Sequence, residues 1–444
     1  MPPLCYNLPV LELPDDVNSY IKKRLASALT PEMLDLLVRA SSLAAEHGWH
    51  IYLVGGYVRD VLLKIPDYDI DISVEGDAVA LAALLAGQLN TSIQTHQAFG
   101  TAILDLDAGL HLDFVTARKE RYEMPGALPT VEPGTIQDDM ARRDFTINAL
   151  AVHLLPEGPG GLLDPHDGLL DLHAHLIRVL HDGSFIDDPT RIFRAAKLAE
   201  RLSCKIEPHT LELILQAVRD GALYTVSMAR ISRELLLILE EPGADSILAT
   251  LDKLGVLASL YPGLAWPYRP GHIRPTASER ITAAQRRDTY LAAIAAEFAA
   301  DPGEAERLAR WLKLNAPHIR LMRDAAQLTQ LWSRLGEEGQ SPSQTYNLLR
   351  DLDANALEAY GRIEALAADA VPWQRLQDYL AKGRYVKPSV GGDYLKRLGV
   401  PQGPVYRQAL EELLAAKLDG RVEEKEDEER FVEEWLKERS LRAE

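Results

Sequence analysis

Two aspartates lie closely behind a pair of glycines in the segment "LVGGYVRDVLLKIPDYDIDI" (residues 53–72). Residues i and i+2 of a strand point to the same face, so Asp69 and Asp71 would hold two carboxylates together, as a hard cation requires. Asp113, in the alternating segment "LHLDFVTAR", could join them from another strand. Two Mg²⁺ ions on such a cluster would bind a nucleotide's phosphates and activate a hydroxyl for in-line attack. Taken alone, a pair of strand-edge aspartates without a ligand fits these residues about equally well.

The two glycines, Gly55 and Gly56, follow an apolar run and precede a predicted helix that begins at residues 57–59. Glycine permits a tight turn and a close approach of the backbone to a ligand, and the first N–H groups of the helix would be open to an anion. A triphosphate fits this geometry. A lone glycine pair is nevertheless more often an ordinary joint between a strand and a helix.

The elements that must position these residues change in character near residue 186. Before it, short alternating runs separated by Gly, Pro and Asp predict an α/β domain with a small mixed sheet, and Thr30 and Pro31 begin a helix expected on the back of that sheet. After it, apolar residues recur at spacings of three and four, which predicts helices. The chain is therefore expected to be α+β, with breaks at 261–276, near "GEEGQSPSQ" and near "KPSVGGD".

Composition excludes several classes of protein. The chain has 444 residues, 47% of them hydrophobic, and a net charge of −18, which argues against a general, non-specific grip on nucleic acid but not against a local basic groove. Its two cysteines, Cys5 and Cys204, are too far apart in sequence to suggest a disulfide framework or a zinc cluster. With no apolar run of membrane-spanning length and no basic start with an apolar core, we expect a cytoplasmic protein without a membrane partner.

Several motifs along the chain resemble a known family. "GGYVRD…DID" is similar to the nucleotidyltransferase motif of the DNA polymerase β superfamily. "RRDFTINALA" (142–151) followed by "DDPTRIFRAAKLAERL" (187–202) narrows the resemblance to the bacterial class II tRNA nucleotidyltransferases, the family of CCA-adding enzymes and poly(A) polymerases. The segment "LLDPHDGLLDLHAHLIRVL", "RISREL" (230–235) and the tail from "GGDYLKRLG" onward extend it over nearly the whole chain.

The resemblance implies a polymerase-β-like head and an all-α neck, body and tail. The implied boundaries are an N-terminal extension at 1–29, the head at 30–182, the neck at 183–242, the body at 243–340 and the tail at 341–444. It implies transfer of CMP and AMP from CTP and ATP to the 3′ end of tRNA, with release of pyrophosphate. The helical half would hold the acceptor stem and elbow of the tRNA, and no obligate protein partner is expected.

Roles for single residues follow from the same resemblance. Asp69 and Asp71 would hold two Mg²⁺ ions, Asp113 would be the third carboxylate, and the remaining residues would bind the nucleotide. Asp144 would orient the neighbouring arginine of the "RRD" motif. The implied nucleotide-binding residues are Gly55, Gly56, Arg59, Arg143, Asp188, Arg191, Arg194 and Lys197.

Base selection is expected on a helix at 187–197. Cytosine and adenine both present an amine donor beside a ring-nitrogen acceptor, so an aspartate and an arginine side by side can pair with either and reject uracil and guanine. Asp188 and Arg191, at i and i+3, would share a helical face that Arg194 and Lys197 continue. Without the resemblance, a salt-bridged surface helix is the more common meaning of this pattern. The family usually has Glu where Asp187 stands and often Arg where Lys197 stands, and lysine supplies only a point charge.

The polar segment "ARKERYEMPGALPTVEPGTIQDDMA" (117–141) is expected to be a mobile loop. Within the family, enzymes that add only the two cytidines tend to lack such a loop, so full CCA addition ranks first, A-only addition second and CC-only addition third. Poly(A) polymerase ranks lower because the tail is acidic. Other classes are a catalytically silent RNA-binding module and a small-molecule nucleotidyltransferase. His166–Asp167 and His181–Asp182 precede glycines and are interpreted as turns, not as a phosphohydrolase metal site.

Overall fold

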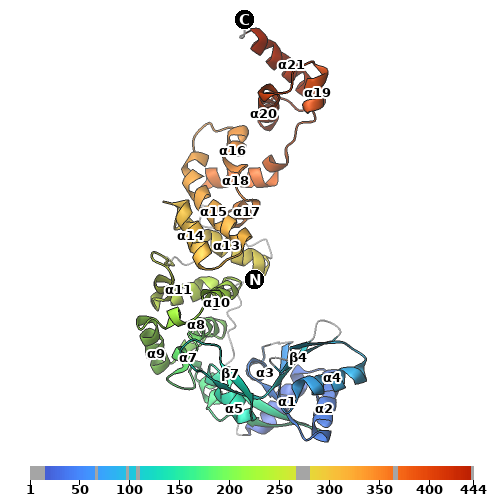
Figure 1. Cartoon of the computed structure of the whole chain (residues 1–444), viewed down its shortest axis with the longest axis vertical. Helices are drawn as coiled ribbons and strands as arrows, with labels where there is room; N and C mark the ends of the chain where they lie inside the picture. The colour runs from blue at the N-terminus through green and yellow to red at the C-terminus, as the bar shows by residue number, and fades with distance from the viewer. Residues whose placement is uncertain are drawn as a thin grey trace. The chain divides into compact units, whose positions relative to one another are not determined.

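The computed structural model describes residues 16–65, 69–96, 100–106, 111–266, 281–363 and 369–441 (Figure 1). The chain divides into two compact units: residues 1–234 with 242–265, and residues 235–241 with 266–444. Most of the predicted break at 261–276 lies outside the described residues.

The first unit is built on a seven-stranded mixed sheet in the order β3-β4-β5-β2-β1-β8-β9. Strand β2 runs parallel to β5, and the other neighbouring strands are antiparallel. Together with the helices of the second unit, this sheet confirms the α+β prediction. The strands are β1 (His50–Val54), β2 (Asp69–Glu75), β3 (Ile93–His96), β4 (Thr101–Asp105), β5 (His111–Thr116), β8 (Ala151–Leu155) and β9 (Gly158–Leu163).

Alternation along β1 and β2 gives the sheet two different faces. Leu53 pairs with Ile72, and both are fully buried with their same-face neighbours, where α2 (Pro31–Glu46) and α4 (Ala78–Leu89) pack on the strands. Thr30 caps α2 by accepting from the Met33 N–H, as predicted. On the other face, Tyr52 packs against α5 (Ile136–Ala141). This second face also carries the aspartates of β2.

The N-terminal helix α1 (Val17–Ala28) packs on β9, where the Asn18 side chain accepts a hydrogen bond from the Leu162 N–H at 2.9 Å. Residues 16–29 are therefore part of the first unit's packing. Residues 1–15 of the predicted extension lie outside the described residues.

The segment 117–141 is not a continuous loop, so that prediction is wrong in part. Strands β6 (Arg118–Arg121) and β7 (Thr130–Pro133) form an antiparallel hairpin, and α5 follows. A capping box between Thr135 and Asp138 begins α5, and burial of Ile136 and Met140 holds it on the sheet. The connections at 122–129 and 134–135 are irregular in structure.

Helices complete the first unit, although residues 235–239 of α10 (Met228–Leu239) belong to the second unit (Figure 1). Asp167 has a φ of 56° just before Gly168, and residues 182–183 form a turn, which confirms both turn interpretations. The remaining elements are α3 (Gly56–Leu63), η3 (Thr146–Asn148), α6 (Gly168–His173), β10 (Leu176–Ile177), α7 (Ser184–Asp187), α8 (Arg191–Arg201), β11 (Lys205–Ile206), α9 (Pro208–Arg219), η4 (Ala222–Thr225), α10 (Met228–Leu239), α11 (Ala244–Lys253) and α12 (Val256–Leu260).

The described part of the second unit is helical. The predicted breaks at "GEEGQSPSQ" and "KPSVGGD" fall between α15 and α16 and between η6 and α19. The elements are α13 (Ala283–Ala296), α14 (Pro302–Trp311), α15 (Ala316–Leu335), α16 (Pro342–Leu349), α17 (Ala354–Tyr360), α18 (Ala370–Ala381), η6 (Gly383–Tyr385), α19 (Gly392–Arg397), α20 (Pro404–Leu418) and α21 (Lys425–Leu441).

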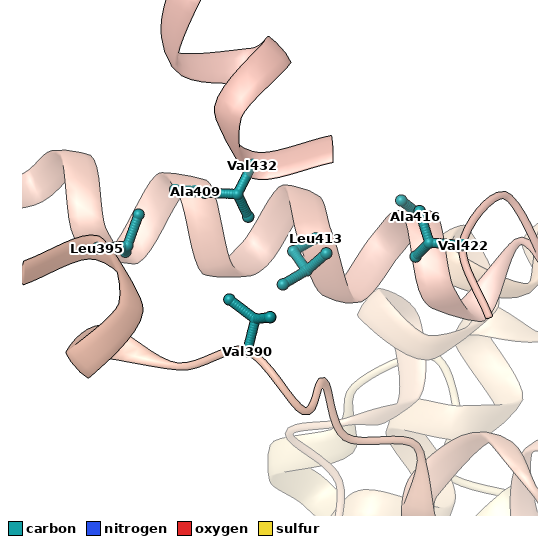
Figure 2. Packing of buried hydrophobic residues seen from close by; sticks show 7 residues of the cluster. All are labelled: Val390, Leu395, Ala409, Leu413, Ala416, Val422 and Val432. Atoms are coloured by element: carbon teal, nitrogen blue, oxygen red, sulfur yellow. The ribbon is translucent and has the colours of Figure 1, made fainter. Parts of the chain in front are cut away.

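The last three helices share a small core of their own, in which Leu413 of α20 lies among Val390, Leu395 and Val432 (Figure 2). Beside this core the fully buried Glu428 accepts from the Ser389 and Val390 N–H groups at 2.7 and 2.8 Å. Among the helices that the structure describes, none is long and apolar enough to cross a membrane.

Candidate active site

A cavity of about 700 Å³ opens within the first unit, between the sheet and helix α8. Its lining comes from β2, the start of α3, the β6 hairpin, η3, α8 and the start of α10. Eight of the eleven predicted site residues line it: Gly56, Arg59, Asp71, Arg143, Asp188, Arg191, Arg194 and Lys197. The other three, Gly55, Asp69 and Asp113, are neighbours of these lining residues in the chain or in the sheet.

Strand register brings the three predicted carboxylates to one sheet face. Asp71 lies opposite Asp113 across the parallel β2–β5 pair, and Asp69 precedes them by one pleat on the same face. Burial raises the pKa of Asp113, and the charge of Asp69 raises it further. The Oδ1 atom of Asp113 is buried without a hydrogen-bond partner. A cation would relieve both the repulsion and the missing contact.

Among the described residues, no group of three or more His, Cys, Asp or Glu side chains is arranged to hold a metal ion. Mg²⁺ is commonly bound by one or two carboxylates together with substrate phosphates, which does not require a preformed cage of protein ligands. Two aspartates one pleat apart beside an unsatisfied carboxyl oxygen fit that mode of binding. The roles of Asp69 and Asp71 as metal ligands stay predictions.

The glycine turn is shaped by a neighbouring arginine. Gly55 has φ 72° and ψ −133°, a conformation that side-chain-bearing residues rarely adopt. A Cβ at this position would lie 2.3 Å from Nη1 of Arg143. The sequence predicts that the backbone approaches a ligand closely at this turn. The structure shows that the guanidinium of Arg143 by itself leaves no room for a side chain at position 55.

Arg59 is almost fully buried and is held by the protein. Its Nε and Nη2 atoms donate to the two carboxylate oxygens of Asp60 at 2.8 and 2.9 Å, and its Nη1 donates to Oδ1 of Asn148 at 2.5 Å. Three of the five N–H groups that an arginine offers are therefore engaged. Any contact of Arg59 with a nucleotide must use the remaining donors.

The acid that orients Arg143 is Asp139, and not Asp144 as the sequence suggested. Arg143 donates to Asp139 at 3.0 Å, and Arg142 donates to the other oxygen of Asp139 at 2.6 Å. Burial alone would raise the pKa of Asp139, but the charges of Arg143 and Arg142 outweigh it and lower the pKa. Asp144 instead pairs with Arg194 of α8 at 2.6 Å. Local sequence patterns do not reveal this exchange, because Arg194 is fifty residues from Asp144.

Asp188 and Arg191 do not share a helical face, which corrects the prediction of one helix over 187–197. Helix α7 ends at Asp187, Asp188 is extended with φ −139° and ψ 92°, and α8 begins at Arg191. The cause is Pro189, because a residue before proline is sterically disfavoured in the helical region. Both side chains still line the cavity.

Each of these two side chains is anchored separately. Oδ1 of Asp188 accepts from the Thr190 backbone N–H and hydroxyl at 3.0 and 2.6 Å and pairs with Arg230 of α10 at 2.9 Å. Arg191 donates to the Ser184 hydroxyl at 2.6 Å and to the Arg142 carbonyl at 2.9 Å. The aspartate and the arginine are thus fixed by different parts of the unit.

Helix α8 presents one polar face to the cavity, as predicted from Arg191, Arg194 and Lys197. The face continues to Arg201, whose Nη2 lies 3.5 Å from Oδ2 of Asp60. The charge of Asp144 raises the pKa of Arg194, so this guanidinium stays charged. Asp187 lies apart from that face, 3.9 Å from Nε2 of His181.

Sequence reasoning missed several residues of the cavity. Glu120, on the β6 hairpin, accepts from Arg118 at 2.8 Å, from Arg142 at 3.1 Å and from the Tyr122 hydroxyl at 3.0 Å. Burial, followed by the charge of Glu120, raises the pKa of Tyr122 to about 12. The i, i+2, i+4 spacing of Arg118, Glu120 and Tyr122 was the available signal, since such residues share one face of a strand. Asp139, Arg142, Asn148, Arg201 and Arg230 also line the cavity.

Two family models match the chain. Residues 51–178 match the poly A polymerase head domain, and residues 204–266 match the probable RNA and SrmB-binding site of polymerase A. The A-adding tRNA nucleotidyltransferase of Halalkalibacterium halodurans is 32% identical over 92% of this chain and 94% of its own length. The A-adding tRNA nucleotidyltransferase of Geobacter sulfurreducens is 35% identical over 86% of this chain, which spans only 44% of that relative.

The solved structure of the Thermotoga maritima CCA-adding enzyme complexed with tRNA_CCA is also similar to this chain. It is 29% identical and has a TM-score of 0.72, with 94% of this chain and 98% of that chain covered. The sheet, the cavity and these matches agree. The chain belongs to the tRNA nucleotidyltransferase family that contains the A-adding and CCA-adding enzymes.

Proposed function

We propose that the chain adds CMP and AMP from CTP and ATP to the 3′ end of tRNA and releases pyrophosphate. The observation that carries the proposal is the content of one cavity: Asp71 of the carboxylate face, Arg143 beside the glycine turn, and Asp188 with Arg191 at the start of α8. This content supports phosphate chemistry and base recognition in a single site. The membership of the family supports the same reaction.

Asp69 and Asp71 would hold Mg²⁺, which when bound neutralises the phosphates and lowers the pKa of the attacking hydroxyl. Arg143, the backbone N–H groups at the start of α3 and the remaining donors of Arg59 would bind the triphosphate. Their charges favour an anion at the end of the cavity next to Asp71. The 3′-hydroxyl of the RNA would attack the α-phosphate in line, and pyrophosphate would leave on the arginine side.

Base selection is assigned to Asp188 and Arg191. The contacts of Asp188 with Thr190 and Arg230 all use Oδ1, so among the described groups Oδ2 is the oxygen placed to accept from an exocyclic amine. Arg191 would donate to the adjacent ring nitrogen. Cytosine and adenine satisfy this donor–acceptor order, whereas uracil and guanine would leave polar groups unpaired. The same pair of side chains can therefore serve both additions.

The second unit is proposed to hold the tRNA. The assigned parts are the head at 30–182, the neck at 183–242, the body at 243–340 and the tail at 341–444, with helices contacting the acceptor stem and elbow through phosphates and shape. The likeness to an enzyme solved with tRNA supports this assignment. The match of residues 204–266 to an RNA-binding model falls mostly in the first unit and supports RNA contacts by the neck and the start of the body.

A-only addition is the second candidate, and a specific observation favours it: the two relatives described above are both named A-adding enzymes. The two functions share transfer of AMP to a tRNA that ends in CC. They differ in whether the same site also accepts CTP on shorter ends.

The test offers the purified protein three tRNAs, ending in the discriminator base, in C and in CC, each with labelled CTP, ATP, UTP or GTP. CCA addition predicts CMP on the first two tRNAs and AMP on the third, with little UMP or GMP. Transfer of AMP to the CC end without any use of CTP would establish A-only addition. Asp71→Asn serves as the inactive control, and wild-type protein that transfers nothing to any of the three would refute the proposal.

A further inference from the structure

The side chain of Asn148 bridges a buried cation and a buried anion. Its Oδ1 accepts from Nη1 of Arg59 at 2.5 Å, and its Nδ2 donates to Oδ1 of Asp144 at 3.0 Å. An arginine can only donate and a carboxylate can only accept, so the orientation of the amide is fixed by its partners. All three side chains are buried, which shields the two hydrogen bonds from competing water.

Both ends of this bridge continue to helix α8. On one side Arg59 is paired with Asp60, and Asp60 lies 3.5 Å from Arg201. On the other side Asp144 pairs with Arg194 at 2.6 Å. Residues 194 and 201 are two turns apart on α8 and both line the cavity, so they lie on one helical face. The side chains thus form a closed ring that leaves α8 at Arg194, crosses the start of α3 and returns at Arg201.

The ring connects the two parts of the site that a nucleotide would have to reach at once. Arg59 belongs to α3, which begins at the glycine turn, and α8 begins at Arg191 in the base-selecting region. The amide is the one uncharged member of the ring and joins its two ion-paired halves. Among the side-chain contacts of the described ring, the amide is the one that joins the two halves without passing through α8.

We propose that Asn148 is a positioning residue that holds the triphosphate-binding turn and the base-selecting helix at a fixed separation. This inference rests on the proposed function and deepens it, because it states how the site fixes the distance between the bound base and the bound phosphates. Asn148 need not touch the nucleotide. Loss of the Asn148 amide would let the triphosphate-binding turn and the base-selecting helix shift relative to each other. A ligand that spans both would then bind less tightly, while a ligand that occupies only the phosphate part would keep its affinity.

The experiment compares ATP with inorganic tripolyphosphate by equilibrium titration of the full chain without RNA. Asn148→Leu removes both hydrogen bonds at nearly the same volume. The expected result is a loss of ATP affinity of about tenfold, equivalent to ~1.4 kcal/mol, with tripolyphosphate affinity changed less than about twofold. Asn148→Asp, which keeps an acceptor for Arg59 but places a second carboxylate against Asp144, is a near-isosteric second variant with the same expected pattern.

The matched control is Asn315→Leu, which removes the side chain that caps α15 in the second unit. It should lower the stability of the chain and leave both affinities unchanged. Equal losses for ATP and tripolyphosphate in the Asn148 variants, or no loss for either, would overturn the positioning role. Wild-type protein that binds ATP but transfers nothing to tRNA would refute the proposed function instead, and the comparison of the two ligands would still decide the role of Asn148.

Discussion

Replacing Arg194 by methionine should destabilise the packing of α8 on the sheet in a way that depends on pH. The side chain of Asp144 is only 3% exposed and lies 2.6 Å from the guanidinium of Arg194. Methionine keeps much of the length of the side chain but carries no charge. The substitution therefore leaves a buried carboxylate without its strongest partner.

The size of the effect follows from burial. Removing one partner of a buried ion pair costs roughly 3–5 kcal/mol, and we expect the lower end, ~3 kcal/mol near pH 8, because the side chain of Arg194 is 45% exposed and solvent screens part of the attraction. Asp144→Asn combined with Arg194→Met removes the charge as well. The double variant should recover ~1–2 kcal/mol relative to Arg194→Met alone.

The pH dependence should reverse sign between wild type and variant. In the wild type, burial alone would raise the pKa of Asp144, but the charge of Arg194 and the hydrogen bond from Asn148 outweigh it, so the pKa is lowered. The pair therefore stabilises the fold above the ordinary carboxyl pKa, and this stabilisation is lost as the pH falls through the lowered value. In Arg194→Met, burial should dominate and raise the pKa, so stability should fall as the pH rises.

The assay is urea unfolding with hydrogen exchange of peptides that cover α8, at pH 4.5 and pH 8. Arg310→Met is the matched control, because Arg310 forms an exposed pair with Glu306 on α14 and should change stability by less than ~0.5 kcal/mol. A loss for Arg194→Met that is the same at both pH values, or no recovery in the double variant, would refute the reasoning.

Three further changes test other parts of the site. Gly55→Ala should cost ~1–3 kcal/mol of stability and displace Arg143, since the φ of Gly55 is 72° and the new Cβ would lie 2.3 Å from Nη1 of Arg143. An unchanged melting temperature and an unchanged ATP affinity would contradict this. Asp113→Asn should raise the melting temperature above neutral pH, because burial and then the charge of Asp69 raise the pKa of Asp113, so that its ionised form destabilises the fold. The same substitution should lower kcat by ~100-fold or more, and a gain in both melting temperature and kcat would refute the assignment. Arg230→Gln should remove the 2.9 Å ion pair with Asp188 and increase misincorporation of UMP and GMP, with kcat for ATP less affected. Unaltered nucleotide selectivity would argue against Arg230 as an anchor of Asp188.

Much of the site was readable in the sequence because its signals are local. The i, i+2 spacing placed Asp69 and Asp71 on one face, and alternation in β5 put Asp113 on the face that the register later matched. The break before α8 also follows from a local rule, since Pro189 disfavours a helical Asp188, whereas the i+3 spacing of Asp188 and Arg191 by itself predicts a shared helical face.

The sequence by itself determined the chemistry available to this protein: which residues carry charge, which strands alternate, and where glycine and proline interrupt an element. These are properties of neighbouring residues, and steric rules within a few bonds decide them. Only the tertiary structure decided the partners of each charge, such as Asp139 for Arg143, Arg194 for Asp144 and Asn148 between Arg59 and Asp144. Several cations compete for each buried carboxylate, and packing of α8 and α5 against the sheet selects among them, because a buried charge is tolerated only where the fold supplies its counter-ion.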